Sequence, residues 1–185
     1  MNRSHAIDAP AGRLQLTALI ELLKPITWFP PMWAFLCGAV SSGAAIFDNL
    51  WLLIAGIALT GPLVCGASQI VNDWFDREVD AINEPHRPIP SGRVPGHWGL
   101  GYAVFWSAVA MAWGLSMGQW VGVATLGGLI LAWIYSAPPL RLKKNGWWGN
   151  AAVGISYEGL AWITGAAVFL QGGIPSLSIC VIAFL

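Results

Sequence analysis

Long apolar stretches separated by short charged segments dominate the pattern along this chain. Pro25 to Phe47, Asn49 to Asn72, Val94 to Leu140 and Gly159 to Leu185 contain no Asp, Glu, Lys or Arg. A helix that crosses a bilayer needs about 20 mostly apolar residues, whereas a buried helix of a soluble protein shows a shorter run of about 10–14. The pattern therefore predicts an all-α fold, a polytopic transmembrane helical bundle.

Five full membrane spans and the start of a sixth account for most of the chain. The fifth span contains one acidic residue, and Gly118-Gln119 is the expected turn between the third and the fourth. The sixth begins near Ile174, and the chain ends within it. The five full spans are expected near Ile26–Phe47, Leu50–Val71, Trp98–Met117, Trp120–Tyr135 and Ala151–Leu170.

Composition agrees with this prediction. Hydrophobic residues make up 56% of the chain and charged residues only 10%, whereas a soluble domain carries about 25% charged residues. The nine acidic and nine basic residues cancel, so the net charge predicts no nucleic-acid partner. Membrane lipid is the expected surrounding, and residues 1–185 form a single transmembrane domain.

The basic residues predict the orientation in the membrane. All of them lie in three segments: before the first span, between the second and third, and between the fourth and fifth. Because Lys and Arg are enriched in cytoplasmic loops, the N-terminal segment 1–22 and both long loops are expected to face the cytoplasm. The three groups are Arg3, Arg13 and Lys24; Arg77, Arg87 and Arg93; and Arg141, Lys143 and Lys144.

An acidic cluster follows the second span. At about 100° per residue, Asn72, Asp73, Asp76 and Asp80 share an arc of about 100° on one helix, whereas Glu78 lies on the other side. We therefore expect the helix end to present three carboxylates and one amide oxygen to a single point.

Carboxylates held together repel one another unless a cation lies between them. Mg²⁺ takes oxygen ligands and commonly binds one or two carboxylates together with substrate phosphates. One interpretation is therefore a metal-bridged diphosphate, contacted also by basic loop residues. The alternative is a solvated acidic helix end paired with local arginines, and spacing alone does not decide between the two. The candidates for diphosphate contact are Arg77, Arg87, Arg93, Arg141 and Lys143.

Tyr157 and Glu158 lie in the middle of the fifth span. An ionisable residue at membrane depth indicates a functional site by default. One interpretation places Glu158 at a cavity for the acceptor substrate, with Tyr157 as a hydrogen-bond donor. The other is a glutamate that is protonated or hydrogen-bonded between packed helices.

The pattern Asn72-Asp73-x-x-Asp76-x-x-x-Asp80 resembles the first aspartate-rich motif of UbiA-type intramembrane prenyltransferases. Its flanks resemble the chlorophyll and bacteriochlorophyll synthases of that superfamily, and the first span is closer to the bacteriochlorophyll branch. The resemblance covers about Leu22 to Ala167. The segments that carry it are Leu23–Trp33, Cys37–Gly43, Asp80–Arg93, Tyr135–Lys143 and Asn145–Asn150.

This resemblance implies an enzyme of bacteriochlorophyll biosynthesis in a photosynthetic bacterium. It would transfer a geranylgeranyl or phytyl group from its diphosphate to the propionate of bacteriochlorophyllide a. Pigment-assembly proteins would be further partners, and the location would be the cytoplasmic or photosynthetic intracytoplasmic membrane. The resemblance implies that Mg²⁺ and the diphosphate are held by the catalytic residues Asn72, Asp73, Asp76 and Asp80.

The family also has a second aspartate-rich motif after the sixth span, and this chain ends before it. We therefore expect a domain truncated at its C-terminus. Two alternatives stay open: a related prenyltransferase with another acceptor, such as an aromatic acid or haem, and a non-catalytic membrane protein that binds pigment.

Overall fold

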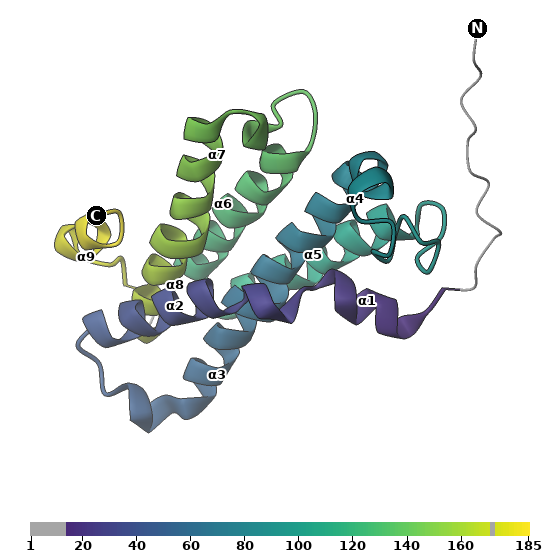
Figure 1. Cartoon of the computed structure of the whole chain (residues 1–185). Helices are drawn as coiled ribbons and strands as arrows, with labels where there is room; N and C mark the ends of the chain where they lie inside the picture. The colour runs from purple at the N-terminus through teal and green to yellow at the C-terminus, as the bar shows by residue number, and fades with distance from the viewer. Residues whose placement is uncertain (1–13, 171–172) are drawn as a thin grey trace, which may run out of the picture.

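The computed structural model describes residues 14–170 and 173–185, and this part of the chain is all-α (Figure 1). The prediction of an all-α fold is therefore confirmed for these residues. The α-helices are α1 (Leu16–Leu22), α2 (Phe29–Ser41), α3 (Leu50–Ala58), α4 (Gly66–Asn83), α5 (Trp98–Ser116), α6 (Gln119–Ser136), α7 (Gly146–Val153), α8 (Leu160–Phe169) and α9 (Leu177–Ile182). Shorter 3₁₀ and π segments join them: η1 (Pro25–Thr27), η2 (Ile46–Asn49), η3 (Leu59–Cys65), η4 (Leu142–Lys144) and η5 (Gly154–Gly159).

Four continuous helical stretches in the described residues are long and apolar enough to cross a membrane. They are Ile46–Asn83, Trp98–Ser116, Gln119–Ser136 and Gly146–Phe169. Four of the five full spans expected from the sequence therefore correspond to span-length helices. The turn expected at Gly118 lies between α5 and α6, where this residue has a φ of 134° that favours glycine.

The segment expected to be the first span is shorter and more broken than predicted. Its regular helix, α2, has 13 residues and is followed by Gly43 at a φ of 74°. Pro30 and Pro31 lie in its first turn, where the absent N–H groups have no intrahelical partner to lose. The predicted sixth span contains only the six-residue helix α9 in the described chain.

The second span bends from α-helix to π-helix and back. Pro62 lies inside η3, between α3 and α4, where its ring is incompatible with regular α-helical hydrogen bonds. The other π segment, η5, joins α7 to α8. Such segments are frequent at functional sites, and both contribute residues to the cavity described below.

Helix α6 lies against α4, α5 and α8, while α2 packs along α8 (Figure 1). The α2–α8 contact is close because each helix places a glycine against the backbone of the other. A Cβ at Gly38 would overlap the carbonyl oxygen of Trp162, and a Cβ at Gly165 would overlap the carbonyl oxygen of Phe35. Small residues allow this approach between membrane helices.

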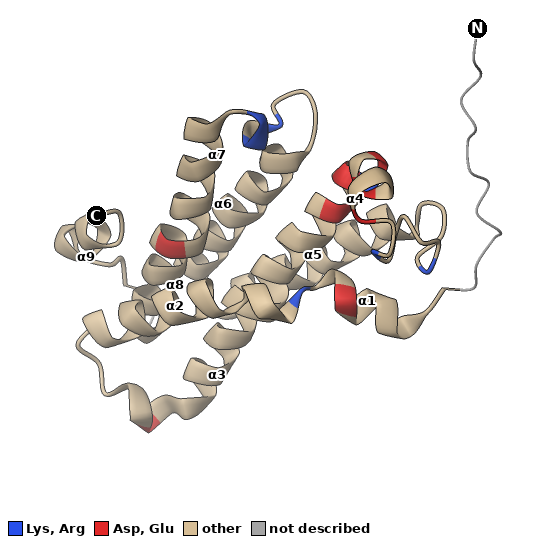
Figure 2. Cartoon of the chain, in the orientation of Figure 1, with Lys and Arg blue, Asp and Glu red and all other residues tan. Residues whose placement is uncertain are grey.

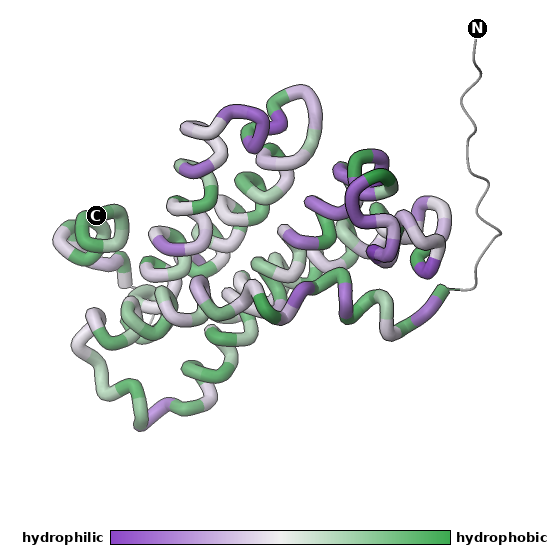
Figure 3. Tube along the Cα trace, in the orientation of Figure 1, coloured by the Kyte–Doolittle hydropathy of each residue, from purple (hydrophilic) through white to green (hydrophobic). Residues whose placement is uncertain are grey.

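Charged residues gather where they can reach water. Figure 3 shows mostly apolar colouring along the helices, with hydrophilic colouring in the loop before α7, at the end of α4 and along α1. In Figure 2, Lys, Arg, Asp and Glu concentrate near the end of α4, before α7 and at the junction of α1 with α2. This arrangement places most charges at one end of the bundle. The chain is a multi-pass membrane protein in its helix composition.

Candidate functional site

The acidic cluster occupies the last turns of α4, where the sequence predicted a helix. Two of its carboxylates are almost completely buried: Asp73 is 2% exposed and Asp80 6%. A carboxylate at such depth requires a charged or hydrogen-bonding partner. The cations that contact the three aspartates come from three different parts of the chain.

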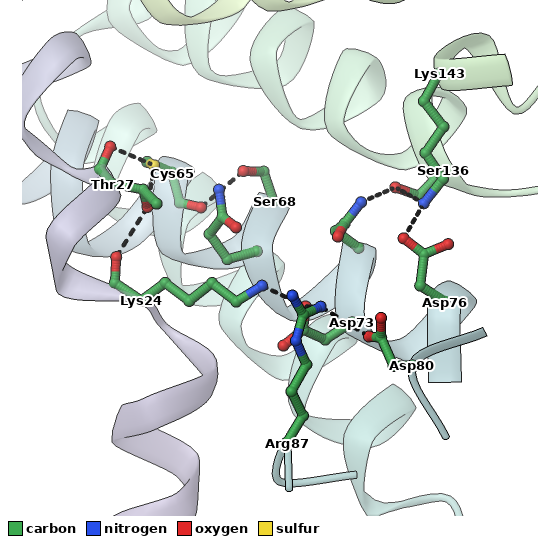
Figure 4. Close-up of polar contacts among 12 residues, drawn as sticks. Lys24, Thr27, Cys65, Ser68, Asp73, Asp76, Asp80, Arg87, Ser136 and Lys143 are labelled. Carbon is green, nitrogen blue, oxygen red and sulfur yellow. Dashed lines mark hydrogen bonds and ion pairs between the residues drawn. The ribbon is translucent and has the colours of Figure 1, made fainter. Parts of the chain in front are cut away.

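Asp73 and Asp80 share one group of cations. The Lys24 ammonium lies 2.5 Å from Oδ1 of Asp73. The Arg87 guanidinium lies 2.9 Å from Oδ2 of Asp80 and 3.6 Å from Oδ1 of Asp73. Figure 4 shows Lys24 reaching towards Asp73 from one side and Arg87 reaching up from its loop between Asp73 and Asp80. The first loop and the chain before α2 thus meet at these two carboxylates.

Asp76 belongs to a second group. Its Oδ1 accepts a hydrogen bond of 2.9 Å from Arg141, and its Oδ2 one of 2.6 Å from Lys143. Lys143 also lies 3.4 Å from the hydroxyl of Ser136, which accepts a hydrogen bond from Asn72. The second loop is therefore tied to α4 at Asp76, where Lys143 and Ser136 lie close by (Figure 4). Asn72 joins this group through its hydrogen bond to Ser136.

The expected convergence of three carboxylates on one point is not observed. In residues 14–170 and 173–185, no group of three or more His, Cys, Asp and Glu side chains lies together. The helical face was predicted correctly, but the basic residues between the carboxylates divide them. Four cations surround three carboxylates, so the two groups together carry an excess of positive charge.

Two of these cations stand on strained backbone. Lys24 has a φ of 45° and Arg141 a φ of 41°, and no other non-glycine residue in the described chain has a positive φ. Such a conformation is uncommon for residues with a Cβ and persists where the surrounding structure holds it. Both distortions precede a short 3₁₀ turn, and each residue directs its side chain to an aspartate of α4.

The donor set fits a hard divalent cation. Carboxylate and amide oxygens are the ligands that Mg²⁺ accepts. The Oδ2 atom of Asp73 is buried and has no hydrogen-bond partner among the residues that the structure describes. A buried, unpaired carboxylate oxygen is costly, so Asp73 is the position where an added cation has most to contribute.

Three of the predicted site residues, Arg77, Arg93 and Glu158, neither contact the aspartates of the cluster nor line the cavity beside it. Arg77 donates to the carbonyl of Trp74, stacks over its ring at 4.4 Å and approaches the exposed Glu78. Arg93 forms an ion pair with Glu21 of α1. Glu158 is exposed and is not among the residues that line the cavity, so the structure does not bring it to the place that the cavity interpretation expected.

Arg93 forms a clasp with α1. Its guanidinium donates to both carboxylate oxygens of Glu21, at 2.6 and 3.0 Å, and to the carbonyl of His86 at 2.6 Å. The Arg93 carbonyl in turn accepts from the backbone N–H of Gln15. This Glu21–Arg93 clasp joins α1 to the loop that carries Arg87. We infer that it positions the loop over α4.

The clasp predicts a pH-dependent stability. Hydrogen bonds from Arg93, together with its charge, hold the pKa of Glu21 below its ordinary value of 4.5. Because the folded-state pKa is lowered, the stabilisation is present above the unfolded-state value and is lost as pH falls through the folded-state value. The wild type should exceed Glu21→Gln in unfolding free energy by about 0.2–1 kcal/mol near neutral pH. Thermal unfolding in detergent should show this difference vanish on acidification; a constant difference would contradict the clasp.

A cavity of about 320 Å³ adjoins the second acidic group. Asn72 and Tyr135 lie on its wall, and Asn72 also bonds Ser136 beside Lys143. The cavity continues along α4 and η3 to Leu59, with α6, η5 and α8 opposite. It therefore connects the charged end of α4 with the apolar interior of the bundle.

Tyr157 lies on the cavity wall and is the centre of a polar network. Its phenol oxygen is 2.9 Å from Nε2 of Gln69, 2.9 Å from the Ser68 hydroxyl and 3.4 Å from the Cys65 thiol. The network connects the two π segments, because Cys65 ends η3 and Tyr157 lies within η5.

Sequence reasoning missed Lys24, Ser136, Ser68 and Gln69. The only available signal for the two serines and Gln69 was a polar residue in an apolar run. Lys24 is 49 residues from Asp73, and no local periodicity links them.

This chain is similar to known membrane prenyltransferases. The UbiA prenyltransferase family matches residues 27–185. The bacteriochlorophyll synthase 33 kDa chain of Rhodobacter capsulatus is 61% identical over 153 residues, which cover 83% of this chain and 50% of that protein. The chain of the same name from Cereibacter sphaeroides is 54% identical over 168 residues, covering 91% of this chain and 55% of that protein. The chain thus spans about half the length of these curated relatives.

Solved structures agree on the fold. A UbiA homolog from Archaeoglobus fulgidus bound to GPP and Mg2+ superposes with a TM-score of 0.75 at 22% identity, over 90% of this chain and 58% of that chain. A structure of digeranylgeranylglyceryl phosphate synthase gives a TM-score of 0.76 at 20% identity, over 91% and 57%. With a family match over most of its length and the same helical arrangement, this chain belongs to the UbiA prenyltransferase family.

Proposed function

We propose that this chain acts in Mg²⁺-dependent transfer of a geranylgeranyl or phytyl group from its diphosphate to the propionate of bacteriochlorophyllide a. The identity of 54–61% to two bacteriochlorophyll synthase chains carries the choice of reaction. The aligned part of this chain includes both loops that supply cations to α4. The Archaeoglobus fulgidus neighbour, described as bound to GPP and Mg2+, supports a prenyl diphosphate as donor.

The charges suit a diphosphate. Lys24, Arg87, Arg141 and Lys143 outnumber the three aspartates that they contact. An anionic donor would find this excess positive charge at the end of α4. We propose that its prenyl chain enters the cavity beside Asn72, where the wall changes from polar to apolar.

Each residue then has a defined task. Asn72, Asp73, Asp76 and Asp80 would hold Mg²⁺, which supplies charge stabilisation to the leaving diphosphate. Arg141 and Lys143 would stabilise the same charge from the second loop. The acceptor carboxylate, ionised near neutral pH, forms a bond to the allylic carbon as the carbon–oxygen bond breaks and its electron pair leaves with the diphosphate. No base is required for this step.

The orientation forms part of the proposal. The positive-inside rule places the two basic loops, the end of α4 and the N-terminus in the cytoplasm of a bacterial cell. Counting α2 as a membrane-embedded helix would give five crossings before α9. Residues 1–13 of the N-terminal segment, including Arg3 and Arg13, lie outside the described residues.

A transfer assay tests this function. Membranes containing the chain, alone or together with the C-terminal half of the Rhodobacter capsulatus relative, receive bacteriochlorophyllide a, geranylgeranyl diphosphate and Mg²⁺. We expect esterified pigment on chromatography and its loss on addition of a chelator. No ester from either preparation, or equal prenylation of an aromatic acid, would contradict the proposed acceptor.

A further inference from the structure

Gln69 lies on the wall of the cavity together with Ser68 and Tyr157. It lies on the same face of α4 as Asn72, three residues earlier, which corresponds to about 4.5 Å along the helix axis. The charged groups lie on the Asn72 side. Gln69 is therefore about one turn inside the cavity from the end where the diphosphate would bind.

The hydrogen bonds around Tyr157 determine where each proton lies. Ser68 donates its only proton to the carbonyl of Cys65 at 2.7 Å. Its oxygen must then accept from the Tyr157 hydroxyl at 2.9 Å. Since a phenol has one proton, the Tyr157 oxygen is left as an acceptor, towards Gln69 and the Cys65 thiol. Tyr157 has no proton available for a ligand.

This arrangement also fixes the amide of Gln69. Its nitrogen must face Tyr157, because the reversed amide would place two acceptor oxygens against each other. No hydrogen bond within residues 14–170 and 173–185 reaches the Gln69 Oε1 atom. A cavity-lining carbonyl, oriented through its nitrogen, is therefore available to a ligand.

The position of this oxygen suggests its use. The allylic carbon of a prenyl diphosphate is bonded directly to the diphosphate, so it lies just inside the charged end of the cavity. Positive charge develops on the allylic group as that bond breaks, and the electron pair leaves with the diphosphate. An oriented dipole in an apolar site stabilises such charge without reorganisation.

We infer that Gln69 is a catalytic residue whose side-chain oxygen stabilises the positive charge on the allylic group during transfer, with Tyr157 as its positioning residue. The inference rests on the proposed function. It assigns a catalytic role to a residue that is neither one of the aspartates nor a basic residue of the two loops.

Binding of two matched probes tests this role without turnover. Dimethylgeranylamine, a protonated mimic of the allylic cation, and geraniol, its neutral counterpart, are titrated into the detergent-solubilised protein with inorganic diphosphate and Mg²⁺. Quenching of the intrinsic tryptophan fluorescence reports binding. Gln69→Leu should lower the affinity for the ammonium probe about tenfold, the value of one charge-assisted contact. The same substitution should change the affinity for geraniol less than about twofold.

Two further variants separate charge recognition from packing. Gln69→Glu should bind the ammonium probe at least as tightly as the wild type, whereas Tyr157→Phe should weaken it by releasing the amide. Thr60→Val is the matched control, because the Thr60 hydroxyl also lies on the cavity wall but is bonded to the carbonyl of Gly56; both probes should respond to it alike.

Equal losses for both probes in Gln69→Leu, or equal losses in the leucine and glutamate variants, would overturn the role of Gln69. Failure of the wild type to esterify pigment, both alone and together with the C-terminal half of the relative, would instead reject the proposed function. An ammonium preference that depends on Gln69 would then still support a site for an allylic cation.

Discussion

Asp76→Asn is expected to lower the rate of prenyl transfer at least about a hundredfold, the scale found when one preorganised electrostatic group is removed from an active site. Asp76 holds Arg141 and Lys143 at 2.9 and 2.6 Å, and it is one of the proposed metal ligands. The substitution keeps the shape of the side chain but removes its charge. The initial rate of ester formation in the transfer assay measures the effect.

Glu78→Gln is the matched control for this variant. Glu78 lies on the same helix, two residues away, but its side chain is 86% exposed and approaches only Arg77 among the cations of the described chain. Its transfer rate should stay within about twofold of the wild type, because exposed ion pairs contribute little. Similar losses in both variants, or none in Asp76→Asn, would contradict a specific role for Asp76.

The second large effect concerns the contact between α2 and α8. Gly38→Ala and Gly165→Ala each place a methyl group where a backbone carbonyl of the other helix lies. Backbone atoms cannot move aside as a side chain can, so the helices must separate. Overpacking of this kind costs about 1–3 kcal/mol and occasionally more. Thermal unfolding of the detergent-solubilised variants should show clearly lowered midpoints.

Gly101→Ala in α5 provides the comparison, because no atom lies within 4 Å of the added methyl group. Its unfolding midpoint should equal or exceed that of the wild type, since alanine favours the helix. A double Gly38→Ala, Gly165→Ala variant should lose less than the sum of the two single losses, because both affect one interface. Fully additive losses of the unfolding midpoint would indicate that the two contacts are disrupted independently of each other.

The spans that the sequence predicted best are those with uninterrupted apolar runs. The helices α5 and α6 begin and end within a residue or two of their expected limits. Prediction was weaker where proline or glycine acts. Pro25, Pro30 and Gly43 limit α2 to a short helix, and Pro62 introduces the π turns of η3. These effects depend on how neighbouring helices satisfy the freed backbone groups, which a hydropathy pattern does not contain.

In the candidate site as well, local features could be predicted from the sequence, whereas tertiary contacts could not. Helical periodicity placed the aspartates on one face of α4, which is a local property. Their separation into two groups depends on Lys24 and Arg141, whose unusual backbone and distant partners arise only from tertiary packing. The solvated alternative, with the acids paired to local arginines, contained part of the answer, because Arg87 does contact Asp73 and Asp80.

The central claim is that the aspartates of α4 bind a divalent cation together with a diphosphate. Its most direct test is Mn²⁺ binding to the purified chain, followed by electron paramagnetic resonance with and without geranylgeranyl diphosphate. We predict that the diphosphate strengthens Mn²⁺ binding in the wild type and in Glu78→Gln but not in Asp76→Asn. Binding that is unaffected by the diphosphate, or equal in all three proteins, would contradict this metal and diphosphate site.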